Sequence, residues 1–127
     1  MIRIEKTSIT DLRTDAIVNA ANEGLRAGGG VCGAIFQSAG YCMLQEACDQ
    51  IGHCDTGSAV ITPAFHLKSR YIIHAVGPVW RDGLHGEPEQ LYGAYSKSLE
   101  LAAENGCKSI GFPLISSGIF GYPVEAA

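Results

Sequence analysis

Residues 15–35 read DAIVNAANEGLRAGGGVCGAI: an apolar run, a polar loop, three glycines and a helical pattern. Ala16, Ile17 and Val18 form a short apolar run, as expected for a strand that is covered on both faces. From Val31 onward, apolar residues recur at helical spacing. A strand that passes through a glycine loop into a helix predicts an α/β fold, with free backbone N–H groups gathered at the helix start.

Outward from this unit, strands and helices continue to alternate. We predict strands over 2–5, 16–18, 58–62, 71–76 and 109–115, helices over 31–49 and 88–104, and a further helix opening at 122–125. The predicted buried faces hold Val31, Ile35, Ala39, Cys42, Met43 and Ala47 in the first helix, and Leu91, Tyr95, Ser98, Leu99 and Ala102 in the second. Gly40 is a weak point within the first helix. This order predicts a three-layer α/β/α fold with a mixed, largely parallel central sheet.

The composition favours a single packed domain. Of the 127 residues, 46% are hydrophobic and 17% are charged, which predicts one domain over residues 1–127. No apolar run is long enough to cross a bilayer, and charged residues at positions 3, 5 and 6 interrupt any signal segment. We therefore expect a soluble, cytoplasmic protein.

The charge and the cysteines narrow the classes of partner. A formal net charge of −4 argues against duplex nucleic acid or an anionic membrane as partner. A single nucleotide is not excluded, because backbone amides bind phosphate without Lys or Arg. The odd number of cysteines and the lack of a C-x-x-C pair predict reduced thiols and no structural metal. The cysteines are Cys32, Cys42, Cys48, Cys54 and Cys107.

Residues 28–33 satisfy the pattern G-x-G-x-x-G, which marks dinucleotide-binding loops. In such folds the first glycine follows the strand directly, whereas nine residues separate Val18 from Gly28 here. An NAD oxidoreductase is therefore only a minor alternative, and a P-loop is excluded because no Gly-Lys-Ser/Thr follows. What the loop offers is a general anion site made of backbone N–H groups.

A second loop, SSGIFG over residues 116–121, also leaves an apolar strand and enters a predicted helix. The carboxyl ends of parallel strands meet at one edge, where such folds bind ligands. Either loop alone is better explained as a tight turn, but the two together favour a diphosphate. Asn19, Asn22 and Phe120 extend the hypothesis to a sugar, since amides can bind a ribose diol and an aromatic ring can pack on a sugar face. Taken singly, each asparagine favours a turn or cap instead, and Phe120 can also fold inward.

Four ordered blocks of sequence resemble the macrodomain family, whose members bind ADP-ribose. They are residues 15–22 (DAIVNAAN), 28–35 (GGGVCGAI), 74–80 (HAVGPVW) and 116–123 (SSGIFGYP). The resemblance spans residues 2–127 and is strongest to the MacroD-type branch. That branch includes O-acetyl-ADP-ribose deacetylases and hydrolases that remove mono-ADP-ribose from acidic side chains. The resemblance implies an ADP-ribosyl ester hydrolase that acts on O-acetyl-ADP-ribose or ADP-ribosylated protein and needs no cofactor.

The resemblance also implies roles for individual residues. Asn22 would hold the distal ribose and take part in catalysis, with Asn19 beside it. The distal-ribose and phosphate side would be lined by the backbone of the first glycine loop, Gly28, Gly29, Gly30 and Val31. The diphosphate would be wrapped by the second loop, Ser116, Ser117, Gly118, Ile119, Phe120 and Gly121. Adenosine would lie near Ser8, Ile9 and residues 16–18.

Three features depart from the family pattern. A neutral Ser8 replaces an Asp that accepts a hydrogen bond from adenine, which weakens that contact by roughly tenfold in affinity. Cys32 stands where MacroD-type hydrolases carry a catalytic Asp, so it is either a thiolate base or nucleophile, or a small packing residue. Loss of a general base costs about 10²–10⁴ in rate, which leaves a non-catalytic ADP-ribose reader as the alternative function. The family's closing strand and helix do not follow Ala127, so we expect the natural protein to be longer, or another copy of the chain to cover the exposed edge of the sheet.

Overall fold

The computed structural model describes residues 9–28, 30–78 and 86–112. The elements in chain order are η1 (Ile9–Asp11), β1 (Ala16–Ala20), α1 (Gly30–Ala39), α2 (Tyr41–Ile51), β2 (Ala59–Pro63), β3 (Tyr71–Ala75), α3 (Glu87–Glu104) and β4 (Ile110–Gly111). The predictions for residues 2–5, 116–121 and 122–125 lie outside the described residues. No helix in the described ranges is long and apolar enough to cross a membrane.

The described strands form one mixed sheet in the order β2-β3-β1-β4. β1 is parallel to β3 and to β4, whereas β2 is antiparallel to β3. The two central strands, β1 and β3, are almost wholly buried, which explains why their sequences are continuous apolar runs rather than alternating ones. The predicted mixed, largely parallel sheet is confirmed.

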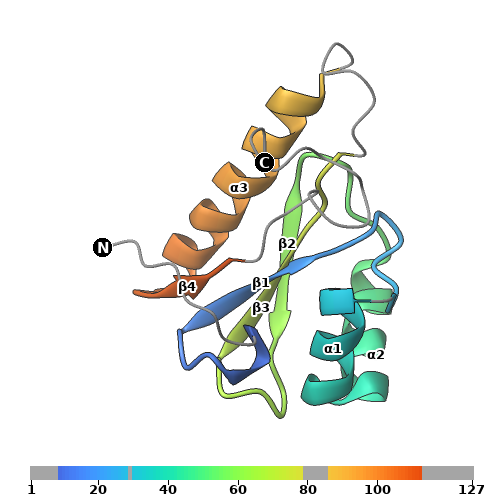
Figure 1. Cartoon of the computed structure of the whole chain (residues 1–127), viewed down its shortest axis with the longest axis vertical. Helices are drawn as coiled ribbons and strands as arrows, with labels where there is room; N and C mark the ends of the chain where they lie inside the picture. The colour runs from blue at the N-terminus through green and yellow to red at the C-terminus, as the bar shows by residue number, and fades with distance from the viewer. Residues whose placement is uncertain (1–8, 29, 79–85, 113–127) are drawn as a thin grey trace.

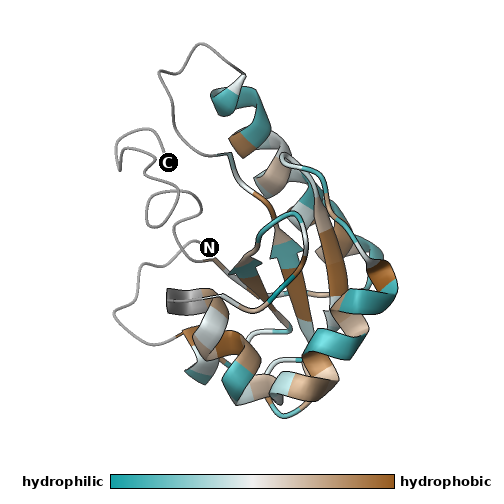
Figure 2. Ribbon diagram, turned by 90° about the vertical axis from the view of Figure 1, so that its right-hand side faces the viewer, coloured by the Kyte–Doolittle hydropathy of each residue, from teal (hydrophilic) through white to brown (hydrophobic). Residues whose placement is uncertain are grey.

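Helices cover both faces of this sheet, as Figure 1 shows: α1 and α2 lie on one side, α3 on the other. Successive side chains of a strand point to opposite faces, so β1 contributes to two separate cores. Ile17 packs toward α1 and α2, while Ala16 and Val18 pack toward α3. In Figure 2 the strands between the helices are coloured largely as apolar. The three-layer α/β/α fold is confirmed.

The helix predicted over residues 31–49 is wrong, because the chain breaks into α1 and α2 at Gly40. Gly40 adopts φ 113°, a conformation that residues with a side chain rarely occupy. The break shifts the buried face of the second helix, so Leu44 and Cys48 are buried while Cys42 and Met43 are exposed. The sequence pattern missed this because a periodic apolar series hides a single change of direction.

α3 agrees better with its prediction. It begins at Glu87 with Pro88 in its first turn and ends at Glu104, with Asn105 as its C-cap. Leu91, Ser98 and Ala102 are buried as predicted, but Leu99 is 52% exposed. Ala94, which the predicted face did not include, is also buried.

Candidate functional site

The segment over residues 21–28 carries the chain from the carboxyl end of β1 to the start of α1. It leaves the sheet at Ala21, whose N–H still donates to the carbonyl of Ala75 at 2.9 Å. A turn then forms around Asn22: its Oδ1 accepts from the N–H of Arg26 at 2.9 Å, and its Nδ2 donates to the carbonyl of Arg26 at 2.8 Å. The amide keeps a second hydrogen and a second lone pair, so Asn22 can still bind a ribose hydroxyl.

The middle of this segment is held from α2. Leu25 is buried with a left-handed φ of 55°, and its N–H donates to the carbonyl of Asn22 at 3.0 Å. The side chain of Gln45 bonds to the backbone on both sides of Arg26: Nε2 to the Leu25 carbonyl and Oε1 to the Ala27 N–H, each at 3.0 Å. Gln45 could not be predicted from the sequence, because nothing in the spacing of α2 connects it with a loop 18 residues away.

Gly28 and Gly33 differ in the space that a side chain would have. At Gly28 a Cβ would meet open space, so the backbone there is accessible. At Gly33 a Cβ would overlap the carbonyl oxygen of Gly28, so only glycine lets the loop fold back onto the first turn of α1. Gly29 lies outside the described residues. Within the G-x-G-x-x-G pattern, Gly33 is thus explained by close backbone packing at a helix start.

Cys32 lies in the first turn of α1 and is buried. Its Sγ accepts from Nδ2 of Asn19 at 3.6 Å and donates to the carbonyl of Arg26 at 3.7 Å. In the described structure, Cys32 connects the loop to the core beneath it.

Asn19 and His74 form a polar pair inside that core. Asn19 is fully buried, and its Nδ2 lies 3.1 Å from Nδ1 of His74 on the neighbouring strand. Burial lowers the pKa of His74 from 6.5 to about 4, so the ring is neutral at physiological pH. Its Nδ1 accepts from Asn19, and its Nε2 donates to Oγ1 of Thr62 at 3.0 Å. Both amide hydrogens of Asn19 are thereby used inside the protein, and its contact with a ligand stays a prediction.

The side-chain oxygen of Asn19 is buried and, among the described residues, unpaired. Its Oδ1 is the one buried side-chain oxygen or nitrogen without a hydrogen-bond partner among the described residues. A buried unpaired amide oxygen is costly, so the contacts of Nδ2 to His74 and Cys32 must outweigh that cost. The position of Asn19 therefore links strand packing to the start of α1.

The remaining predicted site residues are only partly described. Ile9, in η1, is half-buried and packs against the core on the α1 side. Residues 16–18 are buried, so their contact with adenosine stays a prediction. Ser8 and residues 116–121 lie outside the described ranges, so the second loop stays a prediction.

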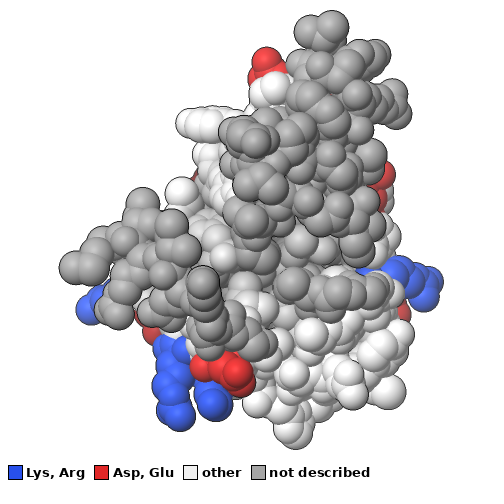
Figure 3. All heavy atoms as spheres, viewed as in Figure 1, with Lys and Arg blue, Asp and Glu red and all other residues white. Residues whose placement is uncertain are grey.

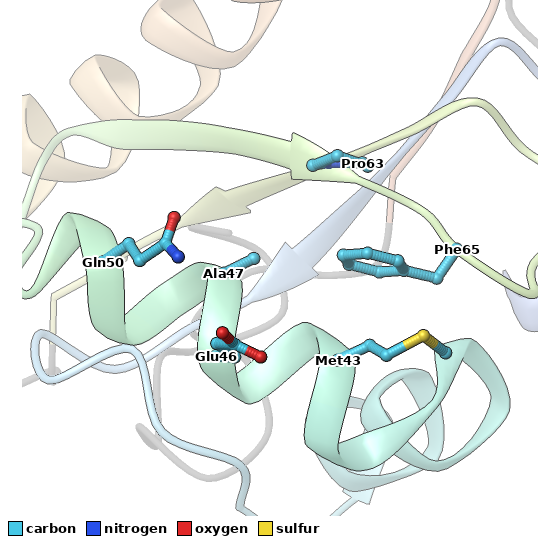
Figure 4. A pocket seen from close by; sticks show the side chains of 6 residues that line it. All are labelled: Met43, Glu46, Ala47, Gln50, Pro63 and Phe65. Carbon is cyan, nitrogen blue, oxygen red and sulfur yellow. The ribbon is translucent and has the colours of Figure 1, made fainter.

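A surface groove of about 330 Å³ lies elsewhere, between α2 and the end of β2. Figure 4 shows Met43 and Phe65 on opposite sides of it, with Glu46 and Gln50 on the helix side. None of the residues predicted for the site lines this groove.

His53 beside Cys54 pairs with Asp55 at 2.8 Å, and no group of ligating side chains able to hold a metal occurs in the described ranges.

The comparisons with known proteins bear on this geometry. A model of the Macro domain family matches residues 18–127. The chain belongs to the macrodomain family. The resemblance carried by its four sequence blocks is confirmed.

This macrodomain is similar to curated proteins of several microorganisms. It is 54% identical over 127 residues to a macro domain-containing protein of Chlorobaculum tepidum, and it covers 73% of that protein. It is 53% identical over 130 residues to an O-acetyl-ADP-ribose deacetylase of Escherichia fergusonii, of which it also covers 73%.

Solved structures of macrodomains superpose closely on this macrodomain. One is the Oceanobacillus iheyensis macrodomain with ADP: TM-score 0.89 and 43% identity, covering 94% of this chain and 67% of that one. Another is the Trypanosoma brucei macrodomain in complex with ADP-ribose: TM-score 0.84 and 44% identity, covering 94% of this chain and 49% of that one.

Proposed function

We propose that this macrodomain binds ADP-ribose through the segment over residues 22–33. The observation that carries the proposal is the ordered turn of Asn22 to Arg26, which leads into an accessible Gly28 backbone at the start of α1. Free N–H groups at a helix start favour phosphate, and the amide of Asn22 can reach a ribose hydroxyl. Relatives whose names state ADP or ADP-ribose as ligand support the same ligand here.

The binding test compares ADP-ribose with NAD by calorimetry. NAD carries the same adenosine diphosphate but adds nicotinamide at the distal ribose, where Asn22 is proposed to bind. ADP-ribose is expected to bind tighter than NAD. Tighter binding of NAD would instead favour the dinucleotide-binding alternative.

We further propose that the ligand is an ADP-ribosyl ester, either O-acetyl-ADP-ribose or mono-ADP-ribose on an acidic side chain. In hydrolysis of the acetyl ester, water oxygen bonds to the acyl carbon, the bond from that carbon to the ribose oxygen breaks, and a proton passes to the ribose oxygen. Asn22 would orient the distal ribose. Water can be activated by the substrate's own phosphate, which needs no protein base. The name of the Escherichia fergusonii relative supports this reaction.

A second function, a non-catalytic ADP-ribose reader, is favoured by the surroundings of Cys32. Its thiol is buried and donates to the carbonyl of Arg26, so it is poorly placed to take a proton from water. A site that keeps the loop and lacks the base would still bind ADP-ribose.

Turnover of O-acetyl-ADP-ribose by the parent, Cys32→Ala and Cys32→Asp separates the two functions. A hydrolase with phosphate-activated water predicts turnover by the parent that survives in Cys32→Ala. If the parent shows no turnover while Cys32→Asp gains it, the reader function is supported and hydrolysis is excluded.

A further inference from the structure

Gln45 on α2 fixes a loop to which it does not belong. It is half-buried, and its amide bonds to the Leu25 carbonyl and the Ala27 N–H, each at 3.0 Å. The orientation of the amide is unambiguous, since a backbone N–H can only donate and a backbone carbonyl can only accept. Gln45 thus holds Arg26 between two anchored neighbours.

The backbone that Gln45 holds is one that would not persist unaided. Leu25 has φ 55°, a left-handed conformation that is disfavoured for a residue with a branched side chain. Such residues persist only where surrounding contacts determine them, and they concentrate at functional sites. Here the contacts are the buried Leu25 side chain and the bond from Gln45 to the Leu25 carbonyl.

The effect of Gln45 reaches Asn22 through Arg26. Both polar atoms of the Asn22 side chain bond to the backbone of Arg26, at 2.9 and 2.8 Å. Gln45 is itself oriented, because its Nε2 also donates to Oδ1 of Asp49 one turn along α2, at 3.0 Å. The series Asp49, Gln45, Arg26 and Asn22 therefore connects a surface helix to the residue proposed to bind the distal ribose.

We propose that Gln45 is a positioning residue of the ADP-ribose site, which holds Asn22 and the loop in the binding arrangement before the ligand arrives. The inference rests on the proposed function. A loop that is ordered in advance loses less conformational entropy on binding. The benefit goes to the diphosphate and the distal ribose, which reach the loop, and not to the adenosine.

Calorimetry with ADP-ribose and with AMP tests this role, since AMP lacks the distal ribose. The variants are Gln45→Ala, which removes both bonds, and Gln45→Glu, which keeps the bond to Ala27 but sets a carboxylate against the Leu25 carbonyl and Asp49. Each is expected to raise the Kd for ADP-ribose about tenfold, Gln45→Ala by losing both bonds to the loop and Gln45→Glu by losing one and adding repulsion at the Leu25 carbonyl. The Kd for AMP should change less than about twofold. Gln50→Ala, at an exposed position of the same helix, is the matched control and should bind both ligands as the parent does.

The outcomes separate the inference from the function on which it rests. If the parent fails to bind ADP-ribose, the proposed function is excluded. If the parent binds but both Gln45 variants bind ADP-ribose normally, or lose AMP equally, then Gln45 does not position the site. Amide hydrogen exchange of the free protein is a measurement that does not depend on ligand. It can be made even if only one of the two Gln45 variants folds. Exchange at Arg26 should be faster in the Gln45 variants than in Gln50→Ala, and unchanged exchange would overturn the inference.

Discussion

At the scale of single residues, the core and the loop are joined by a continuous path of hydrogen bonds. The path starts at the Pro63 carbonyl and runs through Thr62, His74, Asn19, Cys32 and Arg26 to Asn22. Its members come from three strands, a helix and a loop, so no local sequence pattern relates them. Asn19 and Asn22 were both predicted to lie at the ribose; the amide of Asn19 bonds inward to His74, whereas that of Asn22 bonds to the loop backbone at Arg26.

His74 should make stability depend on pH. Its pKa is lowered by burial to about 4, against 6.5 for an unperturbed histidine, so the unfolded chain binds a proton that the folded chain excludes. The stabilisation is fully present above pH 6.5 and is lost as the pH falls toward about 4. At 1.36 kcal/mol per pKa unit the loss is on the order of 3 kcal/mol. Urea unfolding measured at several pH values checks it.

The change of the unfolding free energy with pH, rather than its absolute value, identifies the residue that causes the loss of stability in acid. His74→Gln cannot take up the proton, so its unfolding free energy should fall less between pH 6.5 and 4.5 than that of the parent. His66→Gln, at an exposed histidine, should keep the parent's slope. Equal slopes in the parent and His74→Gln would show that the buried imidazole does not govern the acid response.

Gly33→Ala should disturb the binding loop, because the added methyl overlaps the carbonyl of Gly28. Since the obstacle is backbone, the loop itself must move, at a cost of about 1–3 kcal/mol in stability. We expect the Kd for ADP-ribose to rise by about tenfold or more in calorimetry. Gly24→Ala is the control in the same loop, where the new methyl would have only ordinary contacts, at 3.7 Å. Similar affinities for the two variants would contradict the role given to Gly33.

At the scale of elements, the strands and α3 were predictable and the break between α1 and α2 was not. Strands β1 and β3 follow from continuous apolar runs, and α3 follows from Pro88 at its start and Asn105-Gly106 at its end. Gly40 was identified as a weak point, but its positive φ, and the Met43 and His66 side chains that an added Cβ would meet, cannot be read from a single sequence. The contact of Gln45 with the loop was missed for the same reason, since it follows from how α2 turns after Gly40.

Gly40→Ala should test whether the turn between the two helices requires glycine. At φ 113° an alanine is strained by about 1–3 kcal/mol, so the free energy of unfolding should fall by that amount. Urea denaturation provides the measurement. Gly28→Ala, where the methyl would meet open space and φ is not in the left-handed range, should leave stability nearly unchanged. If Gly40→Ala is as stable as the parent, the break does not depend on glycine.

At the scale of the whole molecule, a negatively charged chain is proposed to bind a negatively charged ligand. The chain carries a formal charge of −4, and on the face seen in Figure 3 the described Lys and Arg side chains lie near the edges without forming a continuous basic patch. Binding of an anionic ligand then depends on backbone N–H groups and on local geometry.

The sequence correctly predicted the three-layer fold and its family, because both depend on patterns that recur along the chain.

This mode of binding predicts a weak dependence on salt. Fixed backbone dipoles at close range are screened less than mobile surface charges, so raising salt from about 50 to about 500 mM should change the Kd for ADP-ribose by less than about threefold. Calorimetry at several salt concentrations measures it. A tenfold or larger loss would mean that cationic side chains, with the exposed Arg26 as the first candidate, hold the diphosphate.

The central claim is that ADP-ribose binds along residues 22–33, and a titration followed by backbone amide NMR tests it most directly. We predict saturable shifts concentrated at Asn22, Arg26, Gly28 and Gly33, with little change at Met43 and Phe65 in the groove beside α2. Shifts centred on that groove, or none at all at saturating ADP-ribose, would contradict the account.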